Sequence, residues 1–125
     1  MLLRDTLLSV LRGFRRVNSP QTTPDRGHRL ENAVFLALRR RGTTVCYAGE
    51  RNSWECDFVT DAAVIQVCSE LTPYNRDREV GGLMRACRLP GKRRPSILTL
   101  NQRDRIREQD VAIEIQPAWE WFLES

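Results

Sequence analysis

The sequence has little of the chemistry on which most hydrolytic enzymes depend. Its 125 residues contain one histidine, His28, and one lysine, Lys92, so 19 of its 20 basic side chains are arginines. No nucleophile motif accompanies the lone histidine, which argues against a Ser–His or Cys–His hydrolase. A Gly-x-x-x-x-Gly-Lys-Ser/Thr phosphate-binding loop is also missing. The sequence on its own therefore does not predict an ATPase.

Long apolar runs are missing too. No stretch approaches the roughly 20 apolar residues that a membrane-spanning helix needs. The apolar residues at the start of the chain are interrupted by Arg4, Asp5 and Arg12, unlike the order of a signal peptide. We therefore expect a globular protein of the cytoplasm with no membrane partner. The chain is long enough to form one core without disulfides or a structural metal.

The four cysteines are far apart and form no Cys-x-x-Cys pair: Cys46, Cys56, Cys68 and Cys87. This spacing disfavours a zinc or redox site. Three of them fall in predicted strands, where a free cysteine of a reducing compartment acts as a small buried hydrophobe. We expect that role here.

Basic residues occur in two triplets that are candidates for nucleic-acid binding: Arg39, Arg40 and Arg41, and Lys92, Arg93 and Arg94. Guanidinium groups suit phosphate because their donors form a fixed fork. The net charge is only +4, however, and such triplets are also typical of a solvated surface. Both interpretations stay open.

The hydrophobic pattern predicts alternating helices and strands. Apolar residues recur at helical spacing in residues 1–17 and again up to Gly42, where the second helix should end. Strands are predicted at 43–49, 54–60, 63–70, 96–101 and 111–116, further helices at 74–89 and 117–125, and a charged connection at 102–110. This order predicts one α/β or α+β domain with helices packed on a central mixed sheet, the parallel strand following the 74–89 helix.

Acidic residues occur on the predicted strand 54–60. Strand alternation places Glu55 and Asp57 on one face and Trp54, Cys56 and Phe58 on the other. The acids should therefore point away from the aromatic core. A simpler interpretation is that both acids are solvated strand positions.

The next predicted strand carries a polar pair, Gln66 and Cys68, on one face. Hairpin pairing should bring Asp57 close to this pair. Glu31, on the preceding helix, should lean over the same edge of the sheet. Alternatively, Glu31 is favoured near the start of its helix by the helix dipole and pairs with a nearby arginine or a backbone donor.

A helix with Glu, a strand with Asp and a neighbouring strand with Glu-x-Lys is the layout of the PD-(D/E)XK nuclease superfamily, which the chain resembles. Its segments HRLENAVFLALRRRG, VCYAG, ECDFV, IQVCSEL, RDREVGGLMRA, SILTLN and IEIQPAWEWFL resemble, in that order, the C-terminal nuclease-like domain of bacterial and archaeal AAA-type ATPases. The resemblance covers residues 26–125 and leaves residues 1–25 as an N-terminal helical segment and loop. It implies a restriction-endonuclease-like fold, with DNA or an ATPase region, in cis or in trans, as partner.

The same resemblance places Glu31, Asp57, Gln66 and Cys68 at the catalytic positions, with Asp57, Glu31 and Glu55 as ligands of Mg²⁺ or Mn²⁺ if the domain is active. Gln66 stands where the superfamily has an acid, and Cys68 stands where it has a lysine. An amide removes one negative charge from a magnesium site, and a neutral thiol does not stabilise the charge that develops on phosphorus. We therefore expect a nuclease-like domain that has lost cleavage and has a DNA-binding or ATPase-associated regulatory role.

Two alternatives remain open. In the first, the chain is a divergent metal-dependent DNase in which Glu31, Glu55 and Asp57 hold one metal ion and Gln66 supplies a carbonyl ligand. In the second, it is an oligomerisation module that forms a homo-oligomer through the apolar face of residues 3–14.

Two further groups have structural interpretations. The aromatic residues Trp119, Trp121 and Phe122 are predicted to lie on a helix that caps the sheet, in preference to a platform for base stacking. Arg78 and Glu79 are predicted to form an ion pair.

Overall fold

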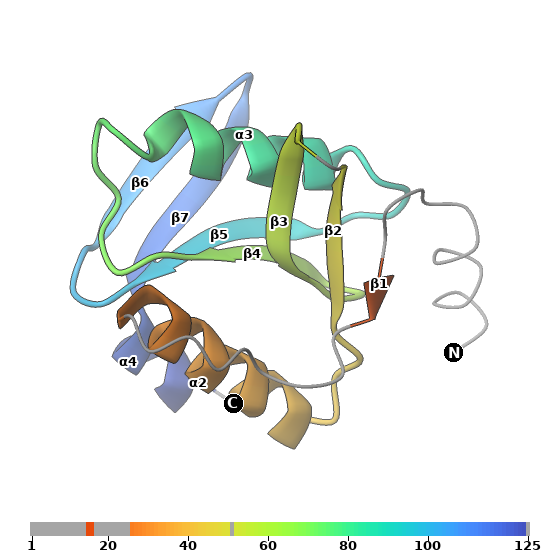
Figure 1. Ribbon diagram of the computed structural model, residues 1–125, viewed down its shortest axis with the longest axis vertical. Coiled ribbons are helices and arrows are strands. Elements are labelled where there is room, and N and C mark those ends of the chain that lie inside the picture. Colours follow the sequence, from red (N-terminus) through yellow and green to blue (C-terminus); the bar gives the residue numbers. More distant parts are fainter. Residues whose placement is uncertain (1–14, 17–25, 51, 125) are drawn as a thin grey trace.

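The computed structural model describes residues 15–16, 26–50 and 52–124. Three layers are visible in Figure 1, with α3 on one face of a central sheet and α2 and α4 on the other. This arrangement confirms the predicted mixed α/β fold with helices on both faces. The elements are β1 (Arg15–Arg16), α2 (Arg26–Arg40), β2 (Cys46–Glu50), β3 (Trp54–Val59), β4 (Ala63–Val67), α3 (Arg76–Cys87), β5 (Arg94–Thr99), β6 (Asp104–Glu108), β7 (Val111–Pro117) and α4 (Ala118–Leu123).

The described sheet has seven strands in the order β1-β2-β3-β4-β5-β7-β6. The pairs β1–β2, β2–β3 and β3–β4 are antiparallel, and the last two are hairpins. After α3 crosses over the sheet, β5 pairs parallel with β4 and also with β7. The prediction that the helix before β5 introduces the parallel pairing is confirmed.

Helix α2 is built as its sequence predicts. Leu30, Val34 and Leu38 recur every four residues and are buried against the sheet. The helix ends at Arg40, and Gly42 just beyond it has a φ of 74°, a left-handed conformation that glycine adopts without strain. The N–H of Gly42 donates to the carbonyl of Arg39 and that of Thr43 to the carbonyl of Leu38, which is a Schellman termination.

Strand β6 was not predicted, because residues 102–110 read as a charged connection. The structure corrects this: Asp104–Glu108 pairs antiparallel with β7. The strand is charged because it forms one edge of the described sheet, where charged side chains discourage pairing with other chains. Its hairpin turn was also hard to recognise, since the left-handed positions are occupied by Gln109 and Asp110, with φ of 50° and 66°, instead of Asn-Gly.

The prediction for the N-terminal segment is tested only at its end. Arg15 and Arg16 form β1, which pairs with Tyr47 and Cys46 of β2, so the predicted helix of residues 1–17 is wrong at these two positions. Residues 1–14 and 17–25 lie outside the described residues.

The core has two halves, one on each face of the sheet. On the α3 side, Leu83 packs with Val64, Ile97 and other apolar residues. On the side of α2 and α4, Val34 packs with Leu98 and other apolar residues, including Ile65 and Val67. Strands β4 and β5 bury side chains on both faces, which explains their nearly continuous apolar sequences.

A bulge in β3 changes which way its residues face. Cys46 pairs with Val59, but Ala48 pairs with Cys56, so β3 has one residue more than β2 between these two pairs. As a result, Cys56 lies in the α3-side core and Phe58 in the α2-side core. The prediction that these two residues share a face is therefore wrong, because alternation is interrupted at the bulge, close to Asp57.

The two adjacent glycines of α3 have different surroundings. A Cβ atom on Gly82 would lie 2.0 Å from the carbonyl oxygen of Glu55 and 2.8 Å from Nε2 of Gln66, whereas one on Gly81 would meet nothing within 4 Å. Gly82 is therefore what allows α3 to lie directly against the backbone of β3. The fold gives no reason for a glycine at position 81.

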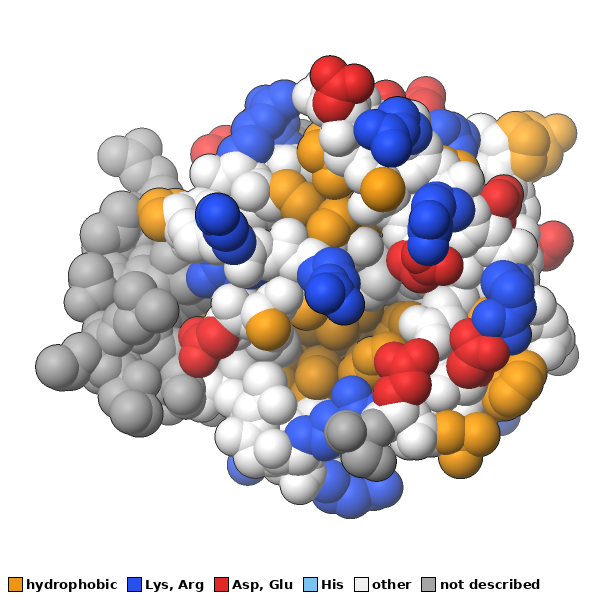
Figure 2. All heavy atoms as spheres, turned by 180° about the vertical axis from the view of Figure 1, so that it is seen from behind, with side chains coloured by type: hydrophobic (Ala, Val, Ile, Leu, Met, Phe, Trp, Pro, Cys, Tyr) orange, Lys and Arg blue, Asp and Glu red, His pale blue; other side chains and the backbone are white. Residues whose placement is uncertain are grey.

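Charges of both signs are mixed on the face shown in Figure 2, with hydrophobic side chains on the floor of hollows between them. This face thus carries no large field of one sign. None of the helices in the described residues is long and apolar enough to cross a bilayer.

The glycine pair gives a matched test of the packing of α3. We expect Gly81→Ala to stabilise the protein by about 0.5–1 kcal/mol, because alanine loses less backbone freedom in a helix. We expect Gly82→Ala to destabilise it by about 1–3 kcal/mol, because the new methyl group forces α3 away from β3. Urea unfolding of both variants measures this difference. Equal effects of the two substitutions would contradict the close approach of helix and strand.

Candidate functional site

Asp57 lies where β3 and β4 stop pairing. The two strands pair with each other at Phe58–Ile65 and Val59–Val64 and not beyond, although β3 begins at Trp54 and β4 continues to Val67. Beyond Phe58 the backbones therefore separate, and their polar groups need other partners.

Two side chains bridge this fork. The backbone N–H of Asp57 donates to Oε1 of Gln66 at 2.8 Å. In return, the backbone N–H of Val67 donates to Oδ2 of Asp57 at 2.8 Å. The prediction that Asp57 and Gln66 come together is confirmed. Their contacts replace the backbone–backbone hydrogen bonds that β3 and β4 do not make here.

Gln66 also connects this fork to α3. Its Nε2 donates to the carbonyl oxygen of Glu55 at 2.9 Å and to that of Glu79 at 3.0 Å. With only 2% of its surface exposed, Gln66 uses both amide hydrogens and its oxygen in contacts to the main chain of β3 and α3. We call Asp57, Gln66 and these backbone contacts the fork network.

Three other carboxylates surround that of Asp57. Burial is the largest cause that raises the pKa of Asp57 well above its usual value, although part of the residue remains exposed. The negative charge of Glu31 is the next cause, followed by those of Glu79 and Glu55, while the hydrogen bond from Val67 acts in the opposite direction. The prediction that Glu31 of α2 leans toward Asp57 is confirmed.

Glu79 is the member of this acidic group that sequence reasoning missed. It was predicted only as a partner of Arg78, and that pair is confirmed at 2.9 Å between Nη2 and Oε2. The Glu79 residue is nevertheless 8% exposed, on the face of α3 that also buries Gly82 and Leu83. An acid on the apolar face of a helix was the signal that could have identified it.

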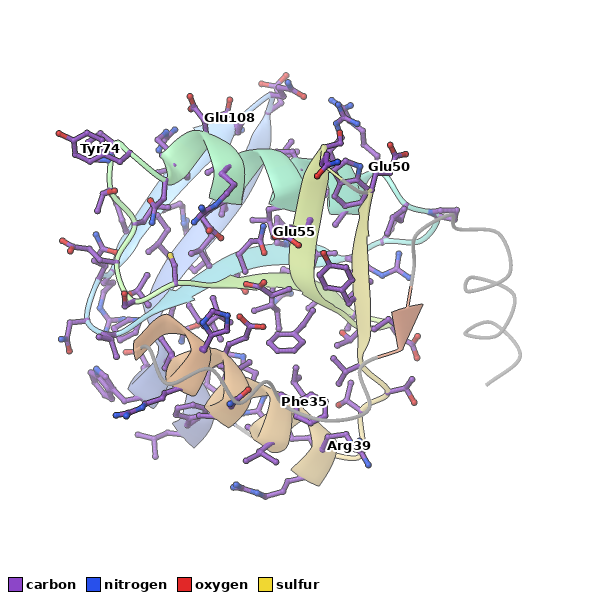
Figure 3. All side chains as sticks on the ribbon, in the orientation of Figure 1. Phe35, Arg39, Glu50, Glu55, Tyr74 and Glu108 are labelled. Carbon is purple, nitrogen blue, oxygen red and sulfur yellow. The ribbon has the colours of Figure 1, made fainter. Side chains whose placement is uncertain are left out.

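Glu55 lies on β3 (Figure 3) and is exposed. Its carboxylate accepts a hydrogen bond from the hydroxyl of Tyr47 on the neighbouring strand. Across the sheet from it, Phe35 points from α2 toward the sheet (Figure 3) and stacks on Phe58, with ring centroids 6.4 Å apart. Glu55 thus belongs to the solvent-facing margin of the acidic group.

Cys68 follows β4 and is 8% exposed. Its backbone N–H donates to the carbonyl of Leu98, which holds the residue beside β5. Burial, followed by the charges of Glu79 and Asp57, raises the pKa of the Cys68 thiol to about 12. The thiol is therefore neutral at physiological pH, so it supplies neither the positive charge of a lysine nor a thiolate nucleophile.

Metal binding by this group stays a prediction. No set of three or more His, Cys, Asp and Glu side chains within the described residues is arranged to hold a metal ion. The donors nearest the predicted site are also engaged, because Oε1 of Gln66 and Oδ2 of Asp57 each accept a backbone hydrogen bond. A metal ion at Oε1 of Gln66 would have to use its second lone pair, beside the hydrogen bond from Asp57.

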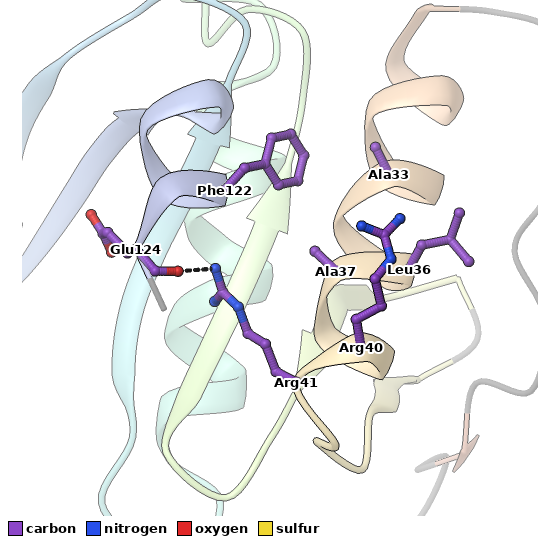
Figure 4. Close-up of a pocket in the computed structure, with 7 residues that line it drawn as sticks. All are labelled: Ala33, Leu36, Ala37, Arg40, Arg41, Phe122 and Glu124. Carbon is purple, nitrogen blue, oxygen red and sulfur yellow. Dashed lines mark hydrogen bonds between the residues drawn. The ribbon is translucent and has the colours of Figure 1, made fainter.

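The two basic triplets are only partly available for binding. Arg41 donates to the carbonyl of Glu124 (Figure 4). It also donates to the carbonyl of Trp121, and its guanidinium lies 4.1 Å from the centre of the Trp121 ring. Arg93 donates to the carbonyls of Thr60 and Pro90. Both arginines therefore hold parts of the fold together.

The other four basic residues of these triplets are exposed: Arg39, Arg40, Lys92 and Arg94. Arg39 lies 5.7 Å from the centre of the Phe35 ring. Sequence reasoning treated each triplet as one unit, whereas the structure divides each of them into side chains engaged within the fold and side chains at the surface.

The predicted aromatic cap is confirmed for one residue. Trp121 is buried in the α2-side core, whereas Trp119 and Phe122 are 54% and 37% exposed. Phe122 lines an open groove of about 640 Å³ between α4 and α2, together with Leu36 and Ala37 (Figure 4). Helix α4 thus covers the sheet with one aromatic side chain and leaves two at the surface.

The chain matches no protein-family model and no solved structure. It is similar to the uncharacterized protein MJ1544 of Methanocaldococcus jannaschii, with 32% identity over 111 residues. The match covers 79% of this chain and 25% of the archaeal protein. The chain therefore spans about a quarter of the length of this curated relative.

The fork network predicts how the stability of the protein changes when Gln66 is replaced by an acid. We expect Gln66→Glu to destabilise the protein by roughly 3 kcal/mol or more at neutral pH, because a buried carboxylate would face two carbonyl oxygens to which it donates nothing. The loss should become smaller in acid, where a protonated Glu donates one hydrogen bond. Chemical unfolding at several pH values measures this. A variant as stable as the wild type would contradict the assigned role of Gln66.

The raised pKa of Asp57 predicts a pH-dependent gain from Asp57→Asn. Because the pKa is higher in the folded state, the stabilising contribution of Asp57 is complete below the usual pKa of aspartate and is lost as the pH rises through the folded value. Asparagine keeps an acceptor for Val67 and has no charge to repel Glu31. The variant should therefore gain stability relative to the wild type as the pH rises.

Unfolding curves between about pH 4 and about pH 8 measure this difference. Asp104→Asn, on the exposed edge strand β6, is the matched control. A difference that stays constant with pH would argue against mutual repulsion in the acidic group.

Proposed function

We propose that this chain is a nuclease-like domain that does not cleave DNA and serves as an accessory domain associated with an ATPase. One observation in particular supports the proposal that the domain does not cleave DNA. All hydrogen-bonding groups of Gln66, at the position where the resembled nucleases have an acid, are used to hold β3, β4 and α3 together. Its amide thus holds parts of the fold together and brings no negative charge to a metal ion.

The surroundings of Gln66 support the same conclusion. Hydrolysis of a phosphodiester by a single-metal site needs an activated water and positive charge near the scissile phosphate. Cys68 is a neutral thiol at the position where the resembled enzymes have a lysine. Lys92 is exposed in the loop between α3 and β5, and arginine does not act as a proton acceptor at physiological pH.

The accessory role is supported by the comparison with MJ1544. The matched region makes up a quarter of that protein, so a region of this kind occurs there joined to a much longer chain. The resemblance to domains that follow AAA-type ATPases indicates which kind of chain. The four free cysteines suit the reducing cytoplasm, since three are buried and the fourth is partly buried.

DNA binding is a second candidate role, favoured by the exposure of Arg40, Lys92 and Arg94. Such side chains contact phosphates without reading sequence, so this binding should weaken as the salt concentration rises. With Arg41 and Arg93 engaged within the fold, we expect the binding to be weak.

A divergent metal-dependent nuclease is a third candidate, favoured by the acidic group itself. Carboxylates whose pKa is shifted by burial and by like charges are typical of functional sites. A divalent cation between Asp57 and Glu31 would relieve their repulsion. If a metal binds, these two side chains are its expected ligands.

Incubation of the purified protein with linear and branched DNA and millimolar Mg²⁺ or Mn²⁺ tests the proposal. We expect no cleavage above that of the Asp57→Ala control, and no rise in the melting temperature with Mn²⁺, since only a ligand that binds the folded state raises it. Cleavage that Asp57→Ala abolishes would show that the domain is an active nuclease. A melting temperature that rises with Mn²⁺ in the wild type alone would show that Asp57 binds metal.

A further inference from the structure

A second groove lies between α3 and the turn that joins β6 to β7, with a volume of about 440 Å³. It is on the flank of α3 that adjoins this hairpin, and none of the side chains of the fork network lines it. Val80, Gly81 and Met84 supply apolar surface, and three arginines stand around it: Arg76, Arg85 and Arg88.

Two contacts fix the positions of Arg76 and Arg88 at the edge of the groove. Nη2 of Arg76 lies 3.4 Å from Oε1 of Glu108, and Nη2 of Arg88 donates to Oε1 of Gln109 at 3.1 Å. They tie the beginning and the end of α3 to the same hairpin turn. The groove between them is thus bordered by elements that are fixed to each other.

The rim has an excess of positive charge. Three arginines line the groove against two acids, Asp77 and Glu108, which leaves one positive charge in excess. Arg85 is exposed and makes no ion pair within the described part of the chain. An anionic partner therefore finds an arginine that has no competing carboxylate.

Gly81 is a second and separate indication. A glycine inside a helix costs roughly 0.5–1 kcal/mol relative to alanine. Gly82 is required by the contact with β3, but a Cβ atom on Gly81 would meet no atom of this chain within 4 Å. Local rules that are broken without a gain for the fold are expected where a protein binds something. The missing side chain widens the groove next to Met84.

We propose that this groove binds an acidic peptide segment of a partner protein, with an apolar side chain of the peptide over Gly81 and its carboxylates on Arg85 and Arg88. Guanidinium groups bind carboxylates in a bidentate manner, and the mostly buried Val80 and Met84 form an apolar floor beside the exposed Gly81. The apolar surface favours a peptide over a nucleic acid, whose backbone offers phosphates and sugars. The inference goes beyond the proposed function, and neither depends on the other.

The test uses a short fluorescein-labelled peptide in which Glu and Leu alternate, and the same peptide with Lys in place of Glu. Fluorescence anisotropy at low salt should show that the protein binds the acidic peptide and not the basic one. We expect Gly81→Leu and Arg85→Glu each to weaken binding at least about tenfold, which corresponds to roughly 1.4 kcal/mol. Arg29→Glu, an exposed charge reversal on α2, is the matched control and should bind as the wild type does.

Thermal melting confirms that each variant is folded, and Gly81→Leu should be, because a Cβ atom at this position meets nothing within 4 Å. Failure of the wild type to bind the acidic peptide would refute the inference. So would wild-type affinity in both groove variants. Binding of duplex DNA that Arg85→Glu weakens and Gly81→Leu does not, without peptide binding, would identify the groove as a nucleic-acid surface instead.

Discussion

The contact between α3 and the backbone of β3 is the constraint on which the rest of the site depends. Gly82 lets the helix approach until the carbonyls of Glu55 and Glu79 are both within reach of the Gln66 amide. With the helix this close, a side chain at position 66 must donate two hydrogen bonds and accept one. Glutamine does so and an ionised glutamate does not, so the close packing of the helix favours an amide over an acid at this position.

Asp57 belongs to an acidic group, although the neighbouring position 66 is an amide. Asp57 keeps its carboxylate beside Glu31 and Glu79, and both burial and these charges raise its pKa. Such an arrangement costs stability at neutral pH. Within the described residues, the Asp57 carboxylate also stabilises the fold, because it accepts a hydrogen bond from the backbone N–H of Val67 and so joins β3 to β4 where they no longer pair. The same carboxylate therefore supports the hairpin and is the residue at which a cation would act.

The arginines of this chain have three different roles that their sequence clusters do not separate. Arg41 and Arg93 bind main-chain carbonyls and join distant segments of the fold. Arg40 and Arg94 are exposed and free to contact a partner in solution. Arg85, which belongs to no triplet, stands at the groove beside Gly81. A count of basic residues thus overstates the surface available to DNA and overlooks a different surface on α3.

The sequence by itself determined the features that depend on neighbouring residues. Periodicity placed α2 and its end at Gly42, and alternation placed Gln66 and Cys68 on one face, because these patterns follow from backbone geometry. Only the tertiary structure decided the bulge next to Asp57, the edge strand β6 and the partners of Gln66. The physical reason is that each depends on how one segment pairs or packs with another, which the local pattern does not specify: pairing with β2 sets the bulge, β7 pairs with β6, and the carbonyl of Glu79 accepts a hydrogen bond from the Gln66 amide.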